Sequence, residues 1–265
     1  MRILRINLII LFAVAAFSCN RDKSLFEEGE AAFNNGKIPE AKVIYTQFTK
    51  EYPTSQWRQL AETQLTKCNR ILELQSSADE FQHSENFDKA IKSYLDISSI
   101  NTYAIDTATI LPSLREKSVI RDSVFLSDLA SFLFNLNADA QLTIWGASSI
   151  DQVTSRNEVH NELFAEGIKK VMSSQSLKKL QDTLSNLYLK IKSPPEKYAA
   201  AVSEIEKSYS AYKELNNTLN HLENYSRFTL RSQLAKLNNE ITSSINNLEI
   251  FLPKSIVEKY KKSKG

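Results

Sequence analysis

Glycine and proline are both scarce in this chain: five glycines and six prolines occur in 265 residues. Loops that hold phosphate groups need closely spaced glycines, and the chain contains no GxGxxG, no GxxxxGKS/T and no GxSxG pattern. Nucleotide-binding loops of these kinds and the nucleophile turn of α/β-hydrolases are therefore excluded. Since the apolar residues recur at helical rather than alternating spacing, the sequence predicts an all-α fold.

Cysteine and histidine are also rare: the chain has two cysteines and three histidines. His83, His160 and His221 lie in no HExxH pair and have no cysteine at metal-binding spacing. Cys68 lies in a helical stretch and is expected to be a small buried apolar residue. If Cys19 is modified as argued below, Cys68 has no cysteine left to pair with. We therefore expect no metal site, no cofactor and no internal disulfide.

The chain also lacks a strong charge of either sign, with 33 Lys and Arg against 31 Asp and Glu. Such a balance gives no reason to expect nucleic acid as a partner. The acid pairs Glu27–Glu28 and Glu204–Glu206 fall on expected solvated helix faces, so we nominate no catalytic residue and expect no enzyme. A pair of acids that folding brings together across a cleft stays open, because such pairs are distant in the chain.

The N-terminus has the features of an export signal. Arg2 and Arg5 precede an apolar run of ten residues, 8–17, whereas a membrane-spanning helix needs about 20. A positive start, a short apolar run and small residues after it are typical of a secretory signal peptide.

The AFSC motif at residues 16–19 resembles the lipobox of bacterial lipoproteins, although Phe17 is bulkier than the family's usual residue. The resemblance implies removal of a signal peptide (1–18) and lipidation of Cys19 by a diacylglycerol and a further acyl group such as palmitate. Several acyl chains hold firmly, because each buried CH₂ contributes about 0.8 kcal/mol. Asn20, in place of aspartate, implies sorting to the outer membrane, facing the periplasm. The alternative is an ordinary cleaved signal with an incidental cysteine.

Residues 25–53 predict a helical hairpin. The first helix ends near Phe33, a turn follows at 34–37, and Pro39 suits the first turn of a second helix, where its missing N–H has no cost. Apolar residues of the second helix recur at spacings of three and four, and Pro53 follows its end. They are Ala41, Ile44, Tyr45 and Phe48.

Gly29 lies twelve residues before Ala41, Tyr45 follows four residues after Ala41, and Pro53 lies eight residues after Tyr45. This spacing resembles a tetratricopeptide repeat. The small residues allow two antiparallel helices to approach closely, and the aromatic side chain fills the space toward the next helix.

A second, weaker copy lies 49 residues further on. Ala78, Ala90 and Tyr94 repeat the spacings of twelve and four, while Thr102 stands where a proline is expected. The usual repeat is about 34 residues, so residues 55–81 are expected to contain a long or a broken helix. Two repeats alone bury too little apolar surface, and the rest of the chain must cap them.

The resemblance implies a groove for an extended segment or a helix of a partner protein. Asn34, Asn35 and Lys37 at the turn are the candidate groove residues, whereas Phe33 and Tyr45 are expected in the core. The binding contacts themselves stay unassigned.

A lipid-bearing cysteine followed directly by such helices is similar to the BamD (YfiO) type of outer-membrane assembly lipoprotein, over about residues 19–100. In that family the repeats bind other subunits of the assembly machine and unfolded barrel proteins. The family has five repeats where this chain has two, and the C-terminal half does not match. The resemblance therefore implies an architecture and a general role, without specific contacts.

The rest of the chain predicts further helices. Residues 105–157 indicate an irregular helical connector that is broken at Pro112. In residues 158–265 apolar residues recur at spacings of three and four, which predicts an antiparallel bundle or a long coiled-coil hairpin. A single helix over 195–252 would extend about 87 Å and form a rod.

The sequence thus predicts a signal peptide (1–18), tetratricopeptide-like repeats (19–104), a connector (105–157) and a helical bundle or hairpin (158–265). The leading hypothesis is a scaffold on the periplasmic side of the outer membrane, which binds proteins through the repeat groove and the membrane through lipidated Cys19. Its role would be in outer-membrane or envelope assembly. The alternative is a coiled-coil tether or spacer of the envelope. Self-association through the C-terminal helices stays open.

Overall fold

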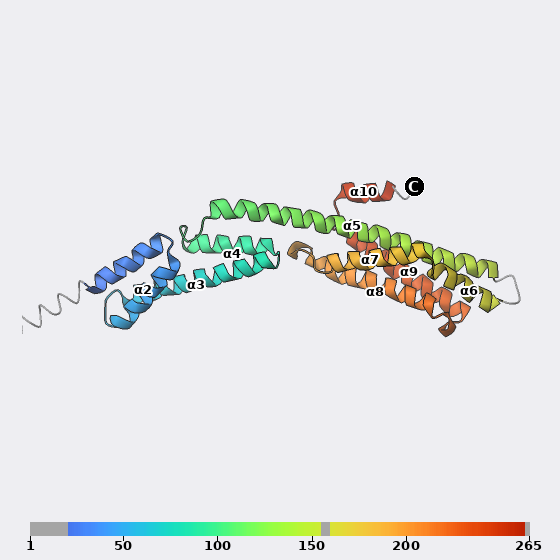
Figure 1. Ribbon diagram of the computed structural model, residues 1–265, viewed down its shortest axis with the longest axis horizontal. Helices are drawn as coiled ribbons and strands as arrows, with labels where there is room; N and C mark the ends of the chain where they lie inside the picture. Colours follow the sequence, from blue (N-terminus) through green and yellow to red (C-terminus); the bar gives the residue numbers. More distant parts are fainter. Residues whose placement is uncertain (1–20, 155–159, 263–265) are drawn as a thin grey trace, which may run out of the picture. The chain divides into compact units, whose positions relative to one another are not determined.

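The computed structural model describes residues 21–154 and 160–262 (Figure 1). All regular structure in these two ranges is helical, which confirms the prediction of an all-α fold. The chain divides into two compact units, residues 1–119 and 120–265, and each is described by itself. The boundary falls inside one long helix, α5 (Thr107–Thr154).

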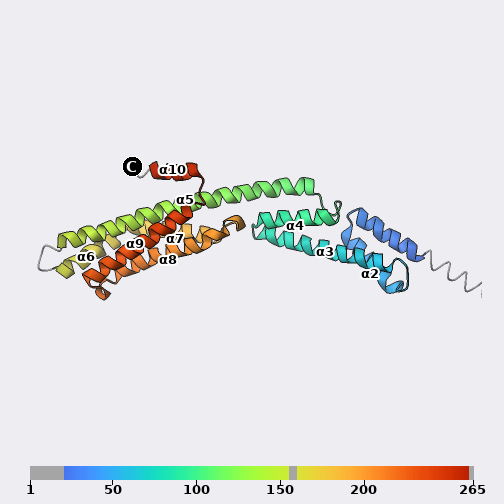
Figure 2. The same cartoon turned by 180° about the vertical axis from the view of Figure 1, so that it is seen from behind.

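The N-terminal unit is built from antiparallel helices joined by short turns (Figures 1 and 2). A first helix over residues 21–34 is followed by α2 (Ile38–Glu51), α3 (Arg58–His83) and α4 (Phe87–Ile100). Helix α3 packs against α2 along its first half and against α4 along its second. The start of α5 contributes Leu111 and Leu114 to the same core.

Residues 55–81 were expected to contain a long or a broken helix, and the structure shows a long one, α3. It runs for 26 residues without interruption, so the extra length between the two hairpins is taken up by one long helix. Its buried residues lie on one stripe at helical spacing, which is why no break is needed. They are Ala61, Cys68, Ile71, Leu74 and Ala78.

Aromatic side chains fill the start of the N-terminal core. The ring of Phe26 stacks on Trp57 at 5.2 Å and meets the rings of Phe48 and Tyr45 at 5.9 and 6.1 Å. Burying rings of this size stabilises the first hairpin against α3, because each ring removes a large apolar area from water. Trp57 stays half-buried at the edge of this cluster.

The C-terminal unit is a helical bundle. Its further helices are α6 (His160–Met172), α7 (Gln175–Ile191), α8 (Val202–Asn220), α9 (Arg227–Glu249) and α10 (Lys254–Lys262), with short 3-10 turns η1 (Glu196–Ala201) and η2 (Leu222–Asn224). Helices α8 and α9 pack along each other, and α6 to α9 share one core with α5 (Figures 1 and 2).

The expectation of an irregular connector over residues 105–157 is wrong. Helix α5 runs through that range for 48 residues and keeps Pro112 inside it. A proline removes one backbone hydrogen bond and crowds the preceding turn. Here it lies in the second turn, where both Pro112 and Ala108 are exposed, so water can solvate the carbonyl group that loses its donor. The proline therefore does not end the helix.

The single helix considered for residues 195–252 is also not formed. Helix α8 ends at Asn220, and Tyr225 is extended with φ −126° and ψ 135°. Ser226 then caps α9, because its hydroxyl accepts a hydrogen bond from the backbone N–H of Thr229. The apolar spacing is kept on both sides of the break, and the two helices pack against each other instead of continuing as a rod.

Within residues 21–154 and 160–262, no helix combines the length and the apolar character that crossing a membrane requires. The candidate signal peptide and Cys19 lie outside the described residues.

Candidate functional site

The first hairpin is closed by contact between a glycine and a tyrosine. A Cβ atom built on Gly29 would lie 2.8 Å from Cε1 of Tyr45, closer than side chains tolerate. The tyrosine side chain is fully buried, and so is Ala41 beside it. The small residues singled out in the sequence thus have the packing role expected of them.

A carboxylate joins three helices behind this contact. Oε1 of Glu30 accepts a hydrogen bond from the hydroxyl of Tyr45 at 2.6 Å and from Nε2 of Gln64 at 2.7 Å. These residues come from the first helix, α2 and α3. Burial raises the pKa of Tyr45, and the bonded Glu30 carboxylate raises it further. Tyr45 is therefore a protonated hydrogen-bond donor that holds the helices in register.

The second hairpin repeats the tyrosine–carboxylate bond, while its glutamine donates to the tyrosine instead of to the acid. The hydroxyl of Tyr94 donates to Oδ1 of Asp79 at 3.2 Å and accepts from Nε2 of Gln82 at 2.6 Å. The tyrosine lies 15 residues after its carboxylate partner in both hairpins. The sequence spacing had shown the tyrosines, but their carboxylate partners were not recognised, because an acid beside a small helical residue resembles any solvated position.

The backbone turns of the two hairpins also correspond. Gly36 and Glu85 both have positive φ, at 74° and 56°. In each turn an N–H closes back on the first helix: Lys37 N–H donates to Ala32 O at 2.9 Å, and Asn86 N–H donates to Phe81 O at 2.7 Å. The helices that follow, α2 and α4, are both 14 residues long. Every one of these features recurs at the 49-residue offset found in the sequence.

Gly36 is also held by the loop that follows α4. A Cβ atom there would overlap the carbonyl oxygen of Tyr103 and lie 2.6 Å from its carbonyl carbon. Next to it, Nδ2 of the buried Asn101 donates to the carbonyl oxygen of Phe33 at 2.5 Å. The loop after the second hairpin thus packs on the turn of the first.

The candidate groove residues lie around this turn as expected. Asn34, Asn35 and Lys37 are exposed, while Phe33 and Tyr45 are buried in the core. Lys37 forms a surface ion pair with Glu40 at 3.2 Å; such exposed pairs contribute little to stability.

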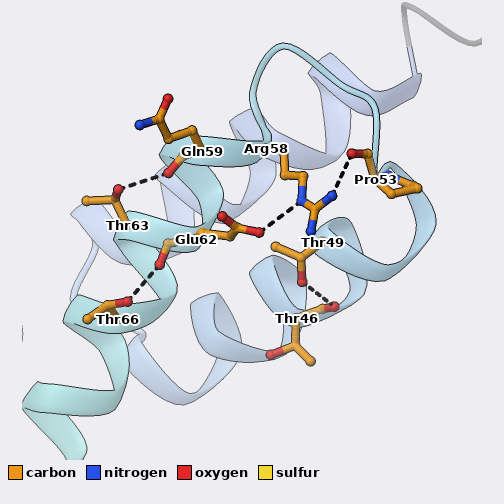
Figure 3. Close-up of polar contacts among 8 residues, drawn as sticks. All are labelled: Thr46, Thr49, Pro53, Arg58, Gln59, Glu62, Thr63 and Thr66. Atoms are coloured by element: carbon orange, nitrogen blue, oxygen red, sulfur yellow. Dashed lines mark hydrogen bonds and ion pairs between the residues drawn. The ribbon is translucent and has the colours of Figure 1, made fainter.

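A group of eight residues lies where α2 ends and α3 begins (Figure 3); Thr46 and Thr49 are half-buried and the other six are exposed. We call it the α2–α3 face, and it consists of Thr46, Thr49, Pro53, Arg58, Gln59, Glu62, Thr63 and Thr66. Arg58 holds it together: Nη1 donates to the carbonyl oxygen of Pro53 at 2.8 Å, and Nε donates to Oε1 of Glu62 at 2.9 Å. The guanidinium thus ties the loop after α2 to the first turn of α3.

The four threonines of the α2–α3 face are bonded within their own helices. Each hydroxyl donates to a carbonyl oxygen about one turn earlier, at 2.7–3.0 Å. Figure 3 shows the bonds of Thr49, Thr63 and Thr66. Because the hydroxyl hydrogens are used in this way, a partner would meet methyl groups and acceptor oxygens. The eight residues of the face carry no charge apart from the Arg58–Glu62 pair, and the exposed Lys50 and Lys67 adjoin them.

Cys68 lies on α3 and is fully buried in the N-terminal core. Burial raises the pKa of its thiol to about 11, so the thiol stays protonated and behaves as a small apolar side chain. His83 and His221 are exposed on separate units. Among the residues with assigned positions, no three His, Cys, Asp or Glu side chains cluster in a way that could hold a metal ion.

The C-terminal unit contains a buried acid that the sequence reasoning missed. Asp139 on α5 is fully buried; it accepts hydrogen bonds from the hydroxyl of Tyr212 on Oδ2 and from that of Thr143 on Oδ1, the latter at 3.2 Å. Burial raises the pKa of the Asp139 carboxyl, and the two hydroxyl donors oppose that rise. In the sequence, the feature that could have indicated this buried acid is a single aspartate, Asp139, among the apolar residues of one helix face.

A cavity of about 560 Å³ also lies in this unit, among α5, α6 and α9. Its wall is mainly apolar, and Arg231 and Asp151 form an ion pair at it, with the arginine Nε donating to the Asp151 carboxylate at 2.8 Å. The arginine is thus already engaged by an acid. The apolar lining consists of Ile144, Ala147, Phe164, Leu230, Leu234 and Ala235.

The chain was compared with models of protein families, with curated proteins and with solved structures, and no match was found in any of the three.

Proposed function

We propose that this protein is a lipid-anchored scaffold of the bacterial cell envelope, which binds a protein partner through two tetratricopeptide-like hairpins. From the sequence resemblance to outer-membrane assembly lipoproteins, we expect it on the periplasmic side of the outer membrane. Its partners would then be other envelope proteins. The proposal has one part for the anchor and one for the hairpins.

The anchor part is supported by the sequence around Cys19. A positive start, a ten-residue apolar run and a small residue before the cysteine all occur at the expected positions. Several acyl chains on one residue would hold the protein on the membrane without a spanning helix.

The 49-residue repeat is the observation that carries the binding part. Two hairpins with the same turn geometry, the same helix length and the same tyrosine–carboxylate contact are most simply explained as copies of one unit. Repeats of paired helices present extended surfaces, and such surfaces bind segments of other proteins. Helix α3 departs from a regular array because its first half has no counterpart in the first hairpin.

The α2–α3 face is the part of this unit that we expect the partner to contact. It is accessible and pre-ordered by the hydrogen bonds of Arg58 and of four threonines. Pre-ordered side chains lose little conformational freedom on binding, which favours affinity. The eight residues of the face carry one arginine–glutamate pair and no other charge, so we expect a protein segment that makes mainly uncharged contacts with them.

Site-specific photo-crosslinking in cells tests this proposal. A photoreactive residue in place of Thr63 samples the α2–α3 face, and one in place of Thr183 on α7 is the matched control. Both threonines are exposed, and both hydroxyls donate to the carbonyl oxygen four residues earlier, at 2.9 and 2.8 Å. The two variants therefore disturb the fold equally.

We expect Thr63 to give a defined crosslinked protein band that Thr183 does not give. In chains without a photoreactive residue, Thr63→Glu should lower the amount of that protein that co-purifies at least about fivefold, because a charge would be buried without a partner. Thr183→Glu should leave the co-purified amount unchanged. No band from Thr63, or the same band from both positions, would show that this face does not bind the partner.

The tether alternative loses its single-rod form. The structure divides residues 195–252 between α8 and α9 with an extended residue between them, although the apolar spacing that motivated the tether is kept in both helices. The scaffold is therefore the better supported proposal.

A further inference from the structure

The first helix of the N-terminal unit is fastened near its start to the loop between α2 and α3. Oδ2 of Asp22 accepts a hydrogen bond from the hydroxyl of Ser55 at 2.6 Å. Oγ of Ser55 in turn accepts one from the backbone N–H of Trp57 at 3.2 Å. Asp22 is only 8% exposed, so water competes little for this bond. Figures 1 and 2 show the start of the first helix beside the loop, residues 52–57, at one end of the unit.

Asp22 is also close in sequence to the proposed site of lipid attachment. Three peptide bonds join Cys19 to Asp22, and three residues of chain reach at most about 11 Å in any conformation. The acyl groups of a lipidated cysteine enter the membrane, which keeps its backbone at the membrane surface. The loop that Asp22 holds is therefore confined to the neighbourhood of that surface.

We propose that this short connection holds residues 21–24 and 52–57, which we call the membrane edge, against the lipid surface. The inference rests on the proposed lipidation of Cys19 and adds to it which part of the folded chain meets the membrane. Pro53 and Arg58 belong to the α2–α3 face, and Arg58 Nη1 donates to the carbonyl oxygen of Pro53. A partner that binds this face therefore meets it next to the membrane.

The side chains of the loop fit the boundary between lipid and water. The rings of Tyr52 and Trp57 are half-buried against the N-terminal core. Rings with an apolar body and one polar atom are enriched at that boundary. Between them, Pro53, Thr54 and Gln56 are exposed and uncharged, so contact with lipid desolvates no ion.

Charge contributes little to this contact. Apart from Arg21, each exposed basic residue in or beside the membrane edge has an exposed acidic neighbour within four residues. These neighbours are Lys23 with Glu27, Lys50 with Glu51, and Arg58 with Glu62. Because the two signs nearly balance, attraction to anionic headgroups is weak. The contact therefore depends on the short length of the connecting chain.

Quenching of a fluorophore by lipid tests the contact in the acylated full-length protein, placed in vesicles of phosphatidylcholine that carries a nitroxide at its headgroup. The fluorophore is attached to Gln56→Cys in the loop or, as the control, to Ser84→Cys beyond the other end of α3. Both positions are exposed, and the buried Cys68 stays unlabelled. The 26 residues of α3 lie between them, a length of about 39 Å. We expect quenching at least about three times stronger at position 56 than at position 84, because only the loop end is held by a short chain.

A longer connection tests the cause of the contact. About ten glycine and serine residues inserted between Asn20 and Arg21 extend the reach to more than about 40 Å. The quenching at Gln56→Cys should then fall at least about threefold, because the loop is free to leave the surface.

The mass of the N-terminal peptide shows whether Cys19 is acylated in each variant. An unmodified Cys19 would overturn the proposed anchor and this inference with it. With Cys19 acylated, equal quenching at the two positions would refute this inference alone. So would quenching at Gln56→Cys that the longer connection leaves unchanged.

Discussion

Replacing Gly36 by alanine should loosen the N-terminal unit. Gly36 has φ of 74°, and its Cα faces the carbonyl group of Tyr103 so closely that a Cβ would overlap the oxygen. The clash is with backbone, so no side-chain rotation relieves it. The loop after α4 must move away, and the hydrogen bond from Asn101 to the carbonyl oxygen of Phe33 moves with it.

The size of the effect follows from two costs and one opposing gain. Left-handed backbone costs a non-glycine residue about 1–2 kcal/mol. Losing a buried hydrogen bond and leaving its partners unpaired costs a further 1–3 kcal/mol or so. Alanine restricts the unfolded chain and returns about 0.4–1 kcal/mol. We therefore expect Gly36→Ala to lower the free energy of unfolding of this unit by about 2–4 kcal/mol.

Urea unfolding followed by tryptophan fluorescence measures this loss. The chain has two tryptophans, and Trp57 lies in the N-terminal unit while Trp145 lies in the C-terminal unit. A Trp145→Phe background leaves Trp57, stacked on Phe26, as the reporter of the N-terminal unit alone. The separation matters because one free energy of unfolding is not defined for two units that unfold independently.

Two control variants identify the cause. Asn35→Ala changes the exposed neighbouring position, where we expect a change within about 0.5 kcal/mol. Glu85→Gly, at the equivalent turn, relieves positive φ and should stay within about 1 kcal/mol of the parent. If Gly36→Ala unfolds at the same urea concentration as the parent, the packing of the 101–106 loop on this turn is refuted.

Three further predictions concern single side chains. Tyr45→Phe should cost about 1–3 kcal/mol in the same urea assay and Tyr94→Phe about 1 kcal/mol or less, because the first bond is shorter and its tyrosine is more deeply buried; equal costs would contradict this. Cys68 should react with a disulfide reagent at pH 8 at least about a hundredfold more slowly in the native chain than in urea, because it is buried and its pKa is raised to about 11; a fast native reaction would show an open core. The pKa of Asp139 is raised above 3.8 by burial, so the folded state keeps a proton that the unfolded chain releases. The free energy of unfolding of the C-terminal unit should therefore fall as pH rises from about 3.8 through the folded pKa, and Asp139→Asn should remove that fall, measured as the difference between the two pH profiles.

The sequence predicted what depends on local spacing. Apolar residues at spacings of three and four along the chain indicated helices, and the spacing from Gly29 to Tyr45 indicated a hairpin whose small residues let two helices approach closely. Those contacts are made within one hairpin, so a single sequence carries enough information. The offset of 49 residues was visible for the same reason, since both copies keep their small residues and their tyrosine.

The errors concern residues whose effect depends on tertiary packing. Pro112 seemed a helix breaker, but in an exposed early turn of α5 water can replace the lost hydrogen bond. Asp139 looked like an ordinary polar position, because its hydroxyl partner Tyr212 lies 73 residues away. The break between α8 and α9 depends on the capping hydroxyl of Ser226, which the continuous apolar spacing concealed.

The central claim, a lipid-anchored scaffold that binds through its N-terminal hairpins, is tested most directly by mass spectrometry after crosslinking in cells. The full-length protein is crosslinked, purified from membranes under denaturing conditions and digested, so that one sample reports the N-terminal peptide and the crosslinked partners. We predict a peptide that begins at Cys19 with the added mass of its acyl groups, together with peptides of another protein joined to residues 21–119. An unmodified Cys19, or the absence of any other protein joined to those residues, would contradict the account.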